Sequence, residues 1–463
     1  GPMCLSAIAK QSGHQTRFVR FVPSAVAEIV KEWSPDVIGW SAFSGEFAAM
    51  AGLNDALKRS HRFVSIFGGP HPTYFPEALL NHNIDYSVVG EGEVALMKLI
   101  DAVGSGSDGS EILNVLTRVK RITELYTLVQ DMDSLPIPDY EGYYSACSFL
   151  KDFPIKLFMS SRGCPYNCSY CFNHQFHSLY KGKGRIIRQY SVGRLIEEVL
   201  FVKKRFPLEF IRFNSDYFVL TRDKWLEEFC EEYPKRAGLP FSCVMNPNNI
   251  TDEIITMLKG AGLKSICLAI ECGNEEDRKN LLTRNIRDET MLDAFGVMHR
   301  HNIRSFATVM LGLPGTTFEK DLETLKFARK CAPTAITAPI FQPYPKLRLT
   351  DYAISRGHYT PDVGGKFNSV FYGKSLLNFS EDVKRKQKNL SDSFGLLAAS
   401  PFLSKMTLPF IGHRLVMLPF IALNNLLSMY IYQTKIFPHR LTPKRLWLNL
   451  KAAIGYFSRI VKT

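Results

Sequence analysis

After Asp392 the sequence contains no aspartate or glutamate. Lysine and arginine continue through this acid-free region and carry most of the formal net charge of +13; they are Lys405, Arg414, Lys435, Arg440, Lys444, Arg445, Lys451, Arg459 and Lys462. Such a one-sided distribution predicts an anionic partner. Nucleic acid would be one such partner, but the sequence carries no recognisable nucleic-acid-binding module, so we expect no nucleic acid.

A secretory signal is also missing. For a chain with ten cysteines, this argues against a disulfide framework and for a reducing cytoplasm. We read Gly1-Pro2 before Met3 as a protease-cleavage remnant and leave it out of the fold reasoning. A chain of 463 residues, 46% of them hydrophobic, is long enough for two or three domains with their own cores.

The most apolar part of the acid-free region runs from Arg414 to Tyr432. Pro419 and the pair Asn424-Asn425 are expected to interrupt it, so we predict no membrane-spanning helix. Two interpretations remain, and they do not exclude each other. The region forms a helical cap on the preceding domain, or it lies on an anionic membrane surface.

Three cysteines stand in one short segment, at Cys164, Cys168 and Cys171. Three thiolates from one loop can bind three irons of a four-iron cube, which leaves the fourth iron open. A zinc knuckle with His174 as the fourth ligand, or simply buried thiols, are the alternatives.

The first hundred residues alternate between helical and strand patterns. The helices are expected at Leu5–Ser12, Ala25–Trp33, Ala48–Ser60 and Pro76–Asn81, and the strands at Thr16–Phe21, Val37–Ser41, Phe63–Phe67 and Tyr86–Val89. This rhythm predicts an α/β domain with a doubly wound, Rossmann-like parallel sheet, whose binding loops follow the strand ends.

Six further apolar strands with helices between them follow, at Lys156–Ser160, Phe210–Phe213, Phe241–Val244, Ser265–Ile270, Ser305–Met310 and Ala335–Phe341. Six such units predict a partial (β/α)6 barrel. We therefore expect four parts: a first domain over 1–103, a linker over 104–150, the barrel over 151–350 and a mainly helical, basic C-terminal region over 351–463.

Four polar or glycine-rich segments follow the barrel strands: Asn214-Ser215-Asp216, Asn246, Ile270-Glu271-Cys272-Gly273 and Leu311-Gly312-Leu313-Pro314-Gly315. Together with the three cysteines they resemble the radical S-adenosylmethionine (SAM) superfamily. The resemblance implies that Cys164, Cys168 and Cys171 bind a [4Fe-4S] cluster whose open iron takes SAM. It further implies SAM contacts from Tyr170, Phe172, Asp216, Asn246, Glu271, Gly312 and Leu313. No side chain beyond the cluster cysteines is identified as catalytic.

The loops of the first domain resemble those of the cobalamin (B12)-binding domain in one branch of that superfamily, which includes class B methyltransferases and the anaerobic magnesium-protoporphyrin cyclase. The residues that this implies for cobalamin are Ser41, Ser44, Gly45, Gly68, Gly69, Pro70, Gly90, Glu91 and Gly92. Three features depart from the family: the first strand is missing, there is no Asp-x-His-x-x-Gly motif for a lower cobalt ligand, and Lys346-Leu347 stands where relatives have Gly-Thr.

The resemblance implies an enzyme that forms a 5′-deoxyadenosyl radical and methylates an unactivated carbon with cobalamin. A cobalamin-independent cyclisation, rearrangement or oxidation with a vestigial first domain is the second hypothesis. A non-enzymatic iron–sulfur or zinc protein is the third. Expected partners are a reductant such as flavodoxin or ferredoxin and a small-molecule or lipid-linked, anionic substrate. The expected location is the cytoplasm, at the inner face of the membrane.

Overall fold

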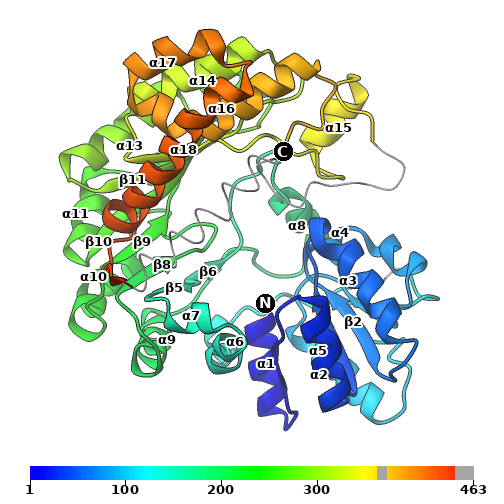
Figure 1. Ribbon diagram of the computed structural model, residues 1–463. Coiled ribbons are helices and arrows are strands. Elements are labelled where there is room, and N and C mark those ends of the chain that lie inside the picture. The colour runs from blue at the N-terminus through cyan, green and yellow to red at the C-terminus, as the bar shows by residue number, and fades with distance from the viewer. Residues whose placement is uncertain (122, 362–372, 444–463) are drawn as a thin grey trace. The chain divides into compact units, whose positions relative to one another are not determined.

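The computed structural model describes residues 1–121, 123–361 and 373–443, which form two compact units (Figure 1). Unit 1 contains Gly1–Phe153 and His174–Tyr190, and unit 2 contains Pro154–Asn173 and the residues from Ser191 onward. Five of the basic residues of the acid-free region lie outside the described residues: Lys444, Arg445, Lys451, Arg459 and Lys462.

Unit 1 is built on a four-stranded sheet in the order β1-β2-β3-β4. The strands β1 (Val37–Ser41), β2 (Val64–Gly68) and β3 (Tyr86–Val88) are parallel, and β4 (Val115–Leu116) pairs antiparallel with β3. The parallel sheet predicted from the sequence is therefore confirmed. The helices and short segments of this unit are α1 (Pro2–Gln11), α2 (Pro23–Trp33), α3 (Ser44–Leu57), α4 (Pro70–Tyr74), η1 (Pro76–Asn81), α5 (Glu93–Gly104), η2 (Met132–Ser134), α6 (Tyr140–Ser145), α7 (Ser148–Asp152), most of α8 (Asn173–Leu179) and β7 (Arg188–Gln189).

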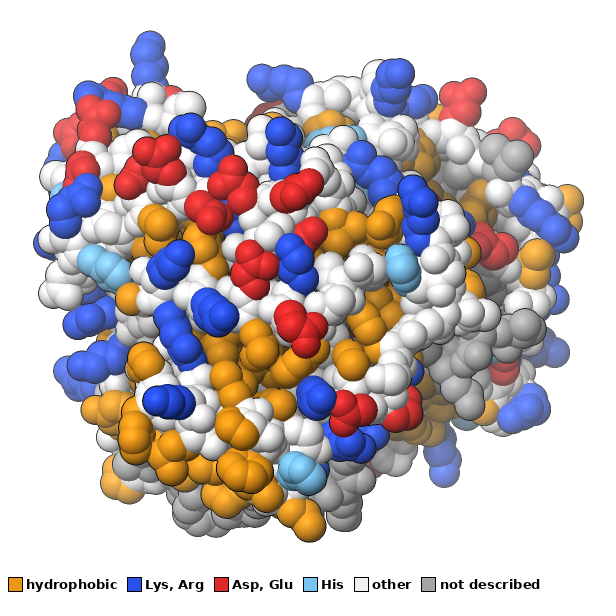
Figure 2. Space-filling view, turned by 90° about the horizontal axis from the view of Figure 1, so that it is seen from above, with side chains coloured by type: hydrophobic (Ala, Val, Ile, Leu, Met, Phe, Trp, Pro, Cys, Tyr) orange, Lys and Arg blue, Asp and Glu red, His pale blue; other side chains and the backbone are white. Residues whose placement is uncertain are grey.

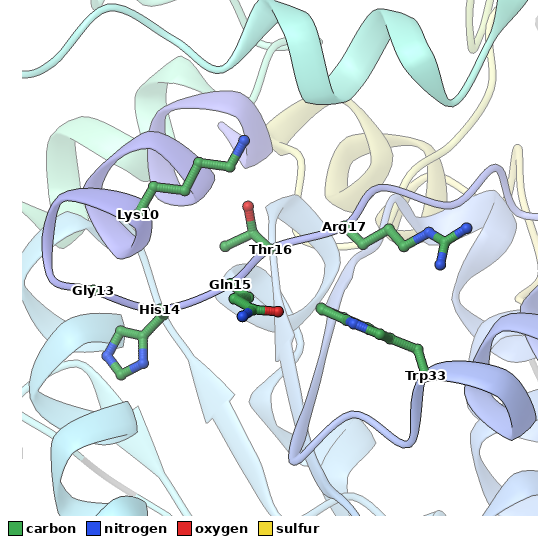
Figure 3. A pocket seen from close by; sticks show the side chains of 7 residues that line it. All are labelled: Lys10, Gly13, His14, Gln15, Thr16, Arg17 and Trp33. Atoms are coloured by element: carbon green, nitrogen blue, oxygen red, sulfur yellow. The ribbon is translucent and has the colours of Figure 1, made fainter.

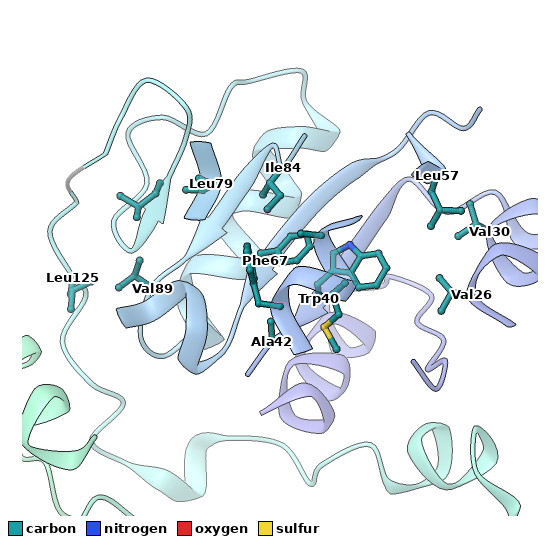
Figure 4. Packing of buried hydrophobic residues seen from close by; sticks show 14 of the residues in the cluster. Val26, Val30, Trp40, Ala42, Leu57, Phe67, Leu79, Ile84, Val89 and Leu125 are labelled. Carbon is teal, nitrogen blue, oxygen red and sulfur yellow. The ribbon is translucent and has the colours of Figure 1, made fainter. Parts of the chain in front are cut away.

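The core of unit 1 lies between the sheet and its helices (Figure 4). Trp40 on β1 stacks on Phe67 on β2 with ring centroids 5.6 Å apart, and Val26 and Val30 bring α2 onto the same cluster. Parallel strands between helices are buried on both faces, which explains why these strands read as nearly continuous apolar runs.

One strand predicted in unit 1 does not form. Thr16–Phe21 has no ladder partner, and among the described residues the sheet begins at β1. In the doubly wound order 2-1-3-4-5 the second strand pairs only with the first, so a sheet without that first strand leaves Thr16–Phe21 with no neighbour. A smaller difference is that Pro76–Asn81 is a 3-10 helix.

Unit 2 contains a six-stranded parallel sheet in the order β12-β11-β10-β9-β8-β5. Its strands are β5 (Ile155–Phe158), β8 (Phe210–Phe213), β9 (Phe241–Val244), β10 (Leu263–Glu271), β11 (Arg304–Val309) and β12 (Ala335–Thr337), and the short β6 (Ser161–Arg162) follows β5. The predicted six strands are confirmed, although β12 ends four residues before the predicted Phe341. Parallel pairing in chain order brings all six carboxyl ends to one edge.

Figure 1 shows helices covering the outer face of this sheet. Among them are α10 (Lys224–Arg236), α11 (Asp252–Gly260), α13 (Asp288–Arg300) and α14 (Phe318–Cys331). The other helical segments between β5 and the C-terminal region are α9 (Val192–Arg205), η3 (Pro247–Asn249), α12 (Glu275–Asn280) and α15 (Arg348–Ser355). Several begin where a side chain accepts a hydrogen bond from an open backbone N–H of the first turn; the capping residues are Ser191, Asp223, Thr251 and Asn274.

The described C-terminal region is helical: α16 (Glu381–Ala399), α17 (Pro401–Thr407), η4 (Leu408–Phe410), α18 (Arg414–Ile431) and the π-helical turn η5 (Tyr432–Ile436). It packs on unit 2 as the cap interpretation predicts, with Ser391 donating to the Ala338 carbonyl at 2.7 Å. The predicted interruption of the apolar stretch is wrong, because α18 runs through Pro419. Pro419 is exposed, so water can satisfy the carbonyl left open.

Candidate functional site

The cysteine segment follows β5 at the carboxyl edge of the unit 2 sheet. Ser215, which follows β8, fixes its start: the Ser215 hydroxyl accepts hydrogen bonds from the N–H groups of Ser160 (2.7 Å) and Ser161 (3.1 Å). Sequence-distant motifs after two neighbouring strands are thereby joined, as the parallel sheet requires.

The three thiols lie close enough for their charges to interact. Burial, together with the nearby Cys168 and Cys164, raises the pKa of the Cys171 thiol to about 11. Burial also raises the pKa of Cys164. Within the ranges that the structure describes, no group of three or more His, Cys, Asp or Glu side chains is arranged to hold a metal ion. This applies to the three cysteines alone as much as to the cysteines with His174, so the choice between zinc and a cluster rests on the donor set. The donor set, three neighbouring thiols in one loop, fits a cluster more readily than zinc.

An arginine outside the predicted motifs, Arg284, lies against this loop. Its guanidinium hydrogen-bonds the sulfur of Cys168 and donates to the Ala269 carbonyl at 2.8 Å. Its Nε has no partner within the described chain. A cation beside thiolates stabilises their charged form, so Arg284 suits a site that holds an anionic cluster.

Glu271 and Tyr170 share this position. The Tyr170 hydroxyl donates to Glu271 Oε1 at 2.9 Å. Burial raises the pKa of Glu271, while Arg284 and the Tyr170 hydrogen bond act in the opposite direction. Burial and the adjacent Glu271 hold the pKa of Tyr170 well above its usual value. The tyrosine is therefore a hydrogen-bond donor at neutral pH, and Glu271 has a second oxygen available for a ligand.

The backbone at Glu271 has an unusual conformation. Its φ is 64°, and the pairing of β10 with β11 shifts register between Ala269 and Glu271. Bulges at strand ends re-aim side chains, and a left-handed non-glycine residue next to one is a feature of functional sites. The strand pattern in the sequence gave no sign of this bulge.

Asp216, Asn246 and Phe172 lie around the same edge. Burial raises the pKa of Asp216, whose charge in turn raises the pKa values of Cys164 and Cys171. Asn246 Oδ1 accepts from the Asn248 N–H at 3.0 Å and so caps η3, which leaves its amide NH₂ for a ligand. The Phe172 ring lies 6.3 Å from that of Tyr344.

Gly312 and Leu313 follow β11 and occupy different surroundings. Leu313 is buried in one apolar cluster with Cys272, against which Tyr170 packs. Gly312 has φ 65°, and its N–H donates to the buried carboxyl of Asp321 at 2.9 Å. Gln387 on α16 donates to the other oxygen of Asp321 at 3.0 Å. The predicted SAM loop is therefore braced by the C-terminal region.

In unit 1, the predicted cobalamin loops lie at the carboxyl edge of the sheet. Ser41 and Gly68 are register partners, so β1 and β2 end together. Gly69 has φ 92°, and a Cβ there would meet the Ala42 backbone at 3.1 Å, so only glycine fits. Ser44 Oγ contacts His71 Nδ1 at 3.1 Å, which ties the first turn of α3, with Gly45, to α4, which begins at Pro70. The structure therefore brings the ends of β1 and β2 and the first turns of α3 and α4 together.

The loop Gly90-Glu91-Gly92 is anchored from the inserted segment of unit 1. The Tyr180 hydroxyl accepts from the Glu91 N–H at 2.7 Å, and Arg188 holds the Glu91 carboxylate with two hydrogen bonds of 2.9 and 2.7 Å. Glu91 therefore offers its carboxylate to Arg188 and not to solvent, while the glycine backbone on either side can approach a ligand.

A hollow of about 480 Å³ lies elsewhere in unit 1, between the end of α1 and Trp33 (Figure 3). It is lined by Lys10, Gly13, His14, Gln15, Thr16, Arg17 and Trp33. None of the residues predicted to bind SAM or cobalamin lines it, so we do not assign it to the chemistry.

Sequence reasoning missed Arg284, Tyr180, Arg188, Asp321 and Gln387. Each is a polar or aromatic side chain outside the motifs that the sequence analysis used. An acidic residue four places into a helix that follows a Gly-Leu-Pro-Gly turn, as at Asp321, is the one signal that could have been used. The others depend on tertiary packing.

Two family models match the chain. Residues 158–328 match the model described as the radical SAM superfamily, and residues 1–100 match the B12 binding domain. The molecule is thus a radical enzyme with two cofactor-binding domains. It contains a radical SAM domain preceded by a B12-binding domain.

Proteins described as methyltransferases and as a cyclase are similar to this chain. A protein of Pyrococcus horikoshii described as an uncharacterized methyltransferase is 26% identical over 381 residues, which are 81% of each chain. The anaerobic magnesium-protoporphyrin IX monomethyl ester cyclase of Rubrivivax gelatinosus is 24% identical over 404 residues, covering 78% of this chain and 71% of the cyclase. The structure of the radical SAM methyltransferase TsrM from Kitasatospora setae, with cobalamin and a [4Fe-4S] cluster bound, superposes with a TM-score of 0.60 at 14% identity, covering 78% of this chain and 73% of TsrM.

Proposed function

We propose that this enzyme methylates an unactivated carbon of a small-molecule substrate, using SAM, a [4Fe-4S] cluster and cobalamin. The observation that carries the proposal is the arrangement of Tyr170, Glu271 and Arg284 beside the cysteine loop, in a chain that also has a B12-binding domain. Bound at these sites, the cluster and SAM supply a 5′-deoxyadenosyl radical, and cobalamin supplies the methyl group.

In this proposal Cys164, Cys168 and Cys171 hold the cluster, and Arg284 balances its negative charge through Cys168. Glu271, fixed by the Tyr170 hydroxyl, accepts hydrogen bonds from the SAM ribose. Asp216, Asn246, Phe172, Gly312 and Leu313 form the remainder of the SAM site. No side chain is required to act as a general base.

In unit 1 the proposed cobalamin site uses the edge formed by Ser41, Ser44, Gly45, Gly68, Gly69, Pro70, Gly90, Glu91 and Gly92. The glycines let the backbone approach a large ligand closely. We also propose the domain boundaries expected from the sequence: the first domain ends at residue 103, the linker at 150 and the barrel at 350.

The second candidate is radical chemistry without cobalamin. The specific observation in its favour is the sheet of unit 1, which among the described residues has no strand ahead of β1. The similarity to a cyclase is compatible with it. The retained, mutually bonded glycine loops favour the cobalamin-dependent reaction.

Radical SAM enzymes need a reductant, and we propose flavodoxin or ferredoxin in this role. We further propose a lipid-linked or anionic substrate and a cytoplasmic location at the inner face of the membrane, supported by the acid-free, basic sequence after Asp392.

The proposal is tested with anaerobically reconstituted protein, a strong reductant and SAM, with 5′-deoxyadenosine as the product measured. Wild type should form it, and Cys168→Ala should not. Cys230→Ala, on α10 and outside the proposed site, is the matched control and should behave as wild type. Equal activity of wild type and Cys168→Ala would refute radical SAM chemistry.

A further inference from the structure

The outer face of α18 is apolar and exposed. The exposed residues are Leu415, Val416, Pro419, Leu423, Leu426, Leu427 and Tyr430. At 3.6 residues per turn they fall in one sector of about 120°, and the only polar group in this sector is the hydroxyl of Tyr430. A surface helix usually turns its charged side outward, so this face calls for a covering partner.

The neighbouring α17 and η4 continue this character with exposed Phe402, Met406 and Phe410. We call these three residues and the seven of α18 the outer apolar face. Figure 2 looks down onto the helices at the top of Figure 1, and hydrophobic side chains gather at the lower left of that view, with lysine and arginine among and beside them.

The opposite side of α18 is fixed to the protein. Arg414 donates to Asp392 and Asn389 on α16 at 2.8 Å, and the side chain of Asn424 bonds the Asp392 carbonyl (3.0 Å) and the Leu396 N–H (2.8 Å). At the far end, Ser265 on β10 donates to the Ile436 carbonyl at 2.5 Å.

These hydrogen bonds of α18 distinguish between a helix that crosses a membrane and a helix that lies in the plane of its surface. The segment Arg414–Ile436, 23 residues, is long and apolar enough by composition to cross a bilayer, one such helix in the part of the chain that the structure describes. Crossing would break the hydrogen bonds of Arg414 and Asn424 and place a charge in hydrocarbon. A helix bound on one side and apolar on the other fits the plane of the interface instead.

The exposed charges on α17 and η5, which flank α18, are positive. Lys405 and Lys435 are exposed, and no ion pair joins either to an acid in the described residues. Asp392, the last acid of the chain, is buried and held by Lys388 and Arg414. The acids that begin α16, Glu381 and Asp382, are paired with cations of the same helix. The surface therefore complements an anionic partner.

We infer that the outer apolar face is a docking surface for a membrane that contains anionic lipid, with α18 lying in the plane of the interface. Residues 444–463 are a competing occupant within the chain, but they contain five cations and no acid, so their charge repels this surface. The inference rests on the peripheral location proposed above and not on the radical chemistry, so its failure leaves the chemistry intact.

The test is co-sedimentation of the full chain with vesicles of phosphatidylcholine alone or with phosphatidylglycerol added. Wild type should bind the anionic vesicles more tightly, and the double variant Leu415→Glu, Leu426→Glu should bind at least about tenfold more weakly. Lys405→Gln, which removes one positive charge, should lower binding by about fivefold, and only to anionic vesicles. Val119→Glu is the control, because Val119 is 93% exposed and lies in unit 1.

Equal binding by wild type and the double variant overturns the inference, as does binding with no preference for anionic lipid. A wild type that self-associates in solution without binding vesicles, and becomes monomeric in the double variant, assigns the face to a second copy of the chain and also overturns it. The remaining case is binding by residues 444–463, which truncation after Pro443 tests. In the shortened chain, the substitutions of Leu415 and Leu426 must still weaken binding. If truncation alone abolishes binding, the tail is the docking element.

Discussion

Gly90 provides a sharp test of how the proposed cobalamin loop is built. Its φ is 75°, and a Cβ at this position would lie 2.0 Å from the Tyr180 hydroxyl and 2.8 Å from Cζ. Tyr180 is 1% exposed, and its hydroxyl accepts from the Glu91 N–H, so the ring cannot swing away into solvent. Gly90→Ala must therefore displace a packed ring and break a buried hydrogen bond.

Gly182 is the matched control. It has the same φ of 75°, but a Cβ there meets nothing within 4 Å. Gly182→Ala should cost only the left-handed backbone strain of about 1 kcal/mol. Gly90→Ala adds the overpacking and the lost hydrogen bond, about 1–3 kcal/mol more, for a total of about 2–4 kcal/mol.

Two measurements are made on both variants. Urea unfolding gives the stability, and separate folded samples are tested for the hydroxocobalamin that they retain after desalting. Gly90→Ala should be the less stable variant and should retain less corrin, whereas Gly182→Ala should retain as much as wild type. Tyr180→Phe, which removes the clashing oxygen, should recover part of the loss in the Gly90→Ala background. Equal destabilisation by the two alanine variants would refute the reasoning.

Other predictions concern unit 2. Burial raises the pKa of Asp321 from its usual 3.8 to about 7, so the contribution of this one group to stability is fully present below pH 3.8 and is lost as the pH rises through 7. Asp321→Asn should remove this loss, about 4 kcal/mol between pH 3.8 and 7, as the difference between the two proteins in urea unfolding at several pH values. Glu271→Gln keeps the shape but loses the charge, and should weaken SAM binding about tenfold in equilibrium titration, while Glu275→Gln on α12 should not. Lys346 has φ 63°, so Lys346→Gly should raise the unfolding free energy by about 1 kcal/mol; a loss would show that the lysine side chain outweighs its backbone strain.

The sequence predicted the parallel sheets because buried strands such as Phe210–Phe213 and Phe241–Val244 are short apolar runs between helical segments. It failed at Thr16–Phe21, where the local pattern is that of a strand but no neighbour exists to pair with it. It also failed at Pro419, because proline in an exposed position of a helix costs less than proline in a buried one.

Part of the candidate site could likewise be predicted from the sequence, and part could not. Cys164, Cys168, Cys171, Glu271 and Gly312 could be found because the motif places them after strands whose carboxyl ends meet. The hydrogen bond between Tyr170 and Glu271 also depends on a bulge in β10, which no periodicity encodes. Lys346 has a left-handed backbone, a conformation that favours glycine, at the position where the resemblance implies Gly.

The support of the site could not be predicted. The half-buried Arg284 reaches Cys168 from a loop more than a hundred residues later, and Gln387 reaches Asp321 from the C-terminal helix α16. These contacts connect segments that share no local pattern, so only the packed structure brings them together.

The most direct test of cobalamin-dependent radical chemistry is the absorption spectrum of the anaerobically reconstituted protein, desalted after incubation with hydroxocobalamin and compared with the same sample without it. Our account predicts corrin bands at about one equivalent beside the broad absorption of the iron–sulfur cluster. A cluster spectrum without corrin would contradict the proposed methyl transfer and favour cobalamin-independent radical chemistry.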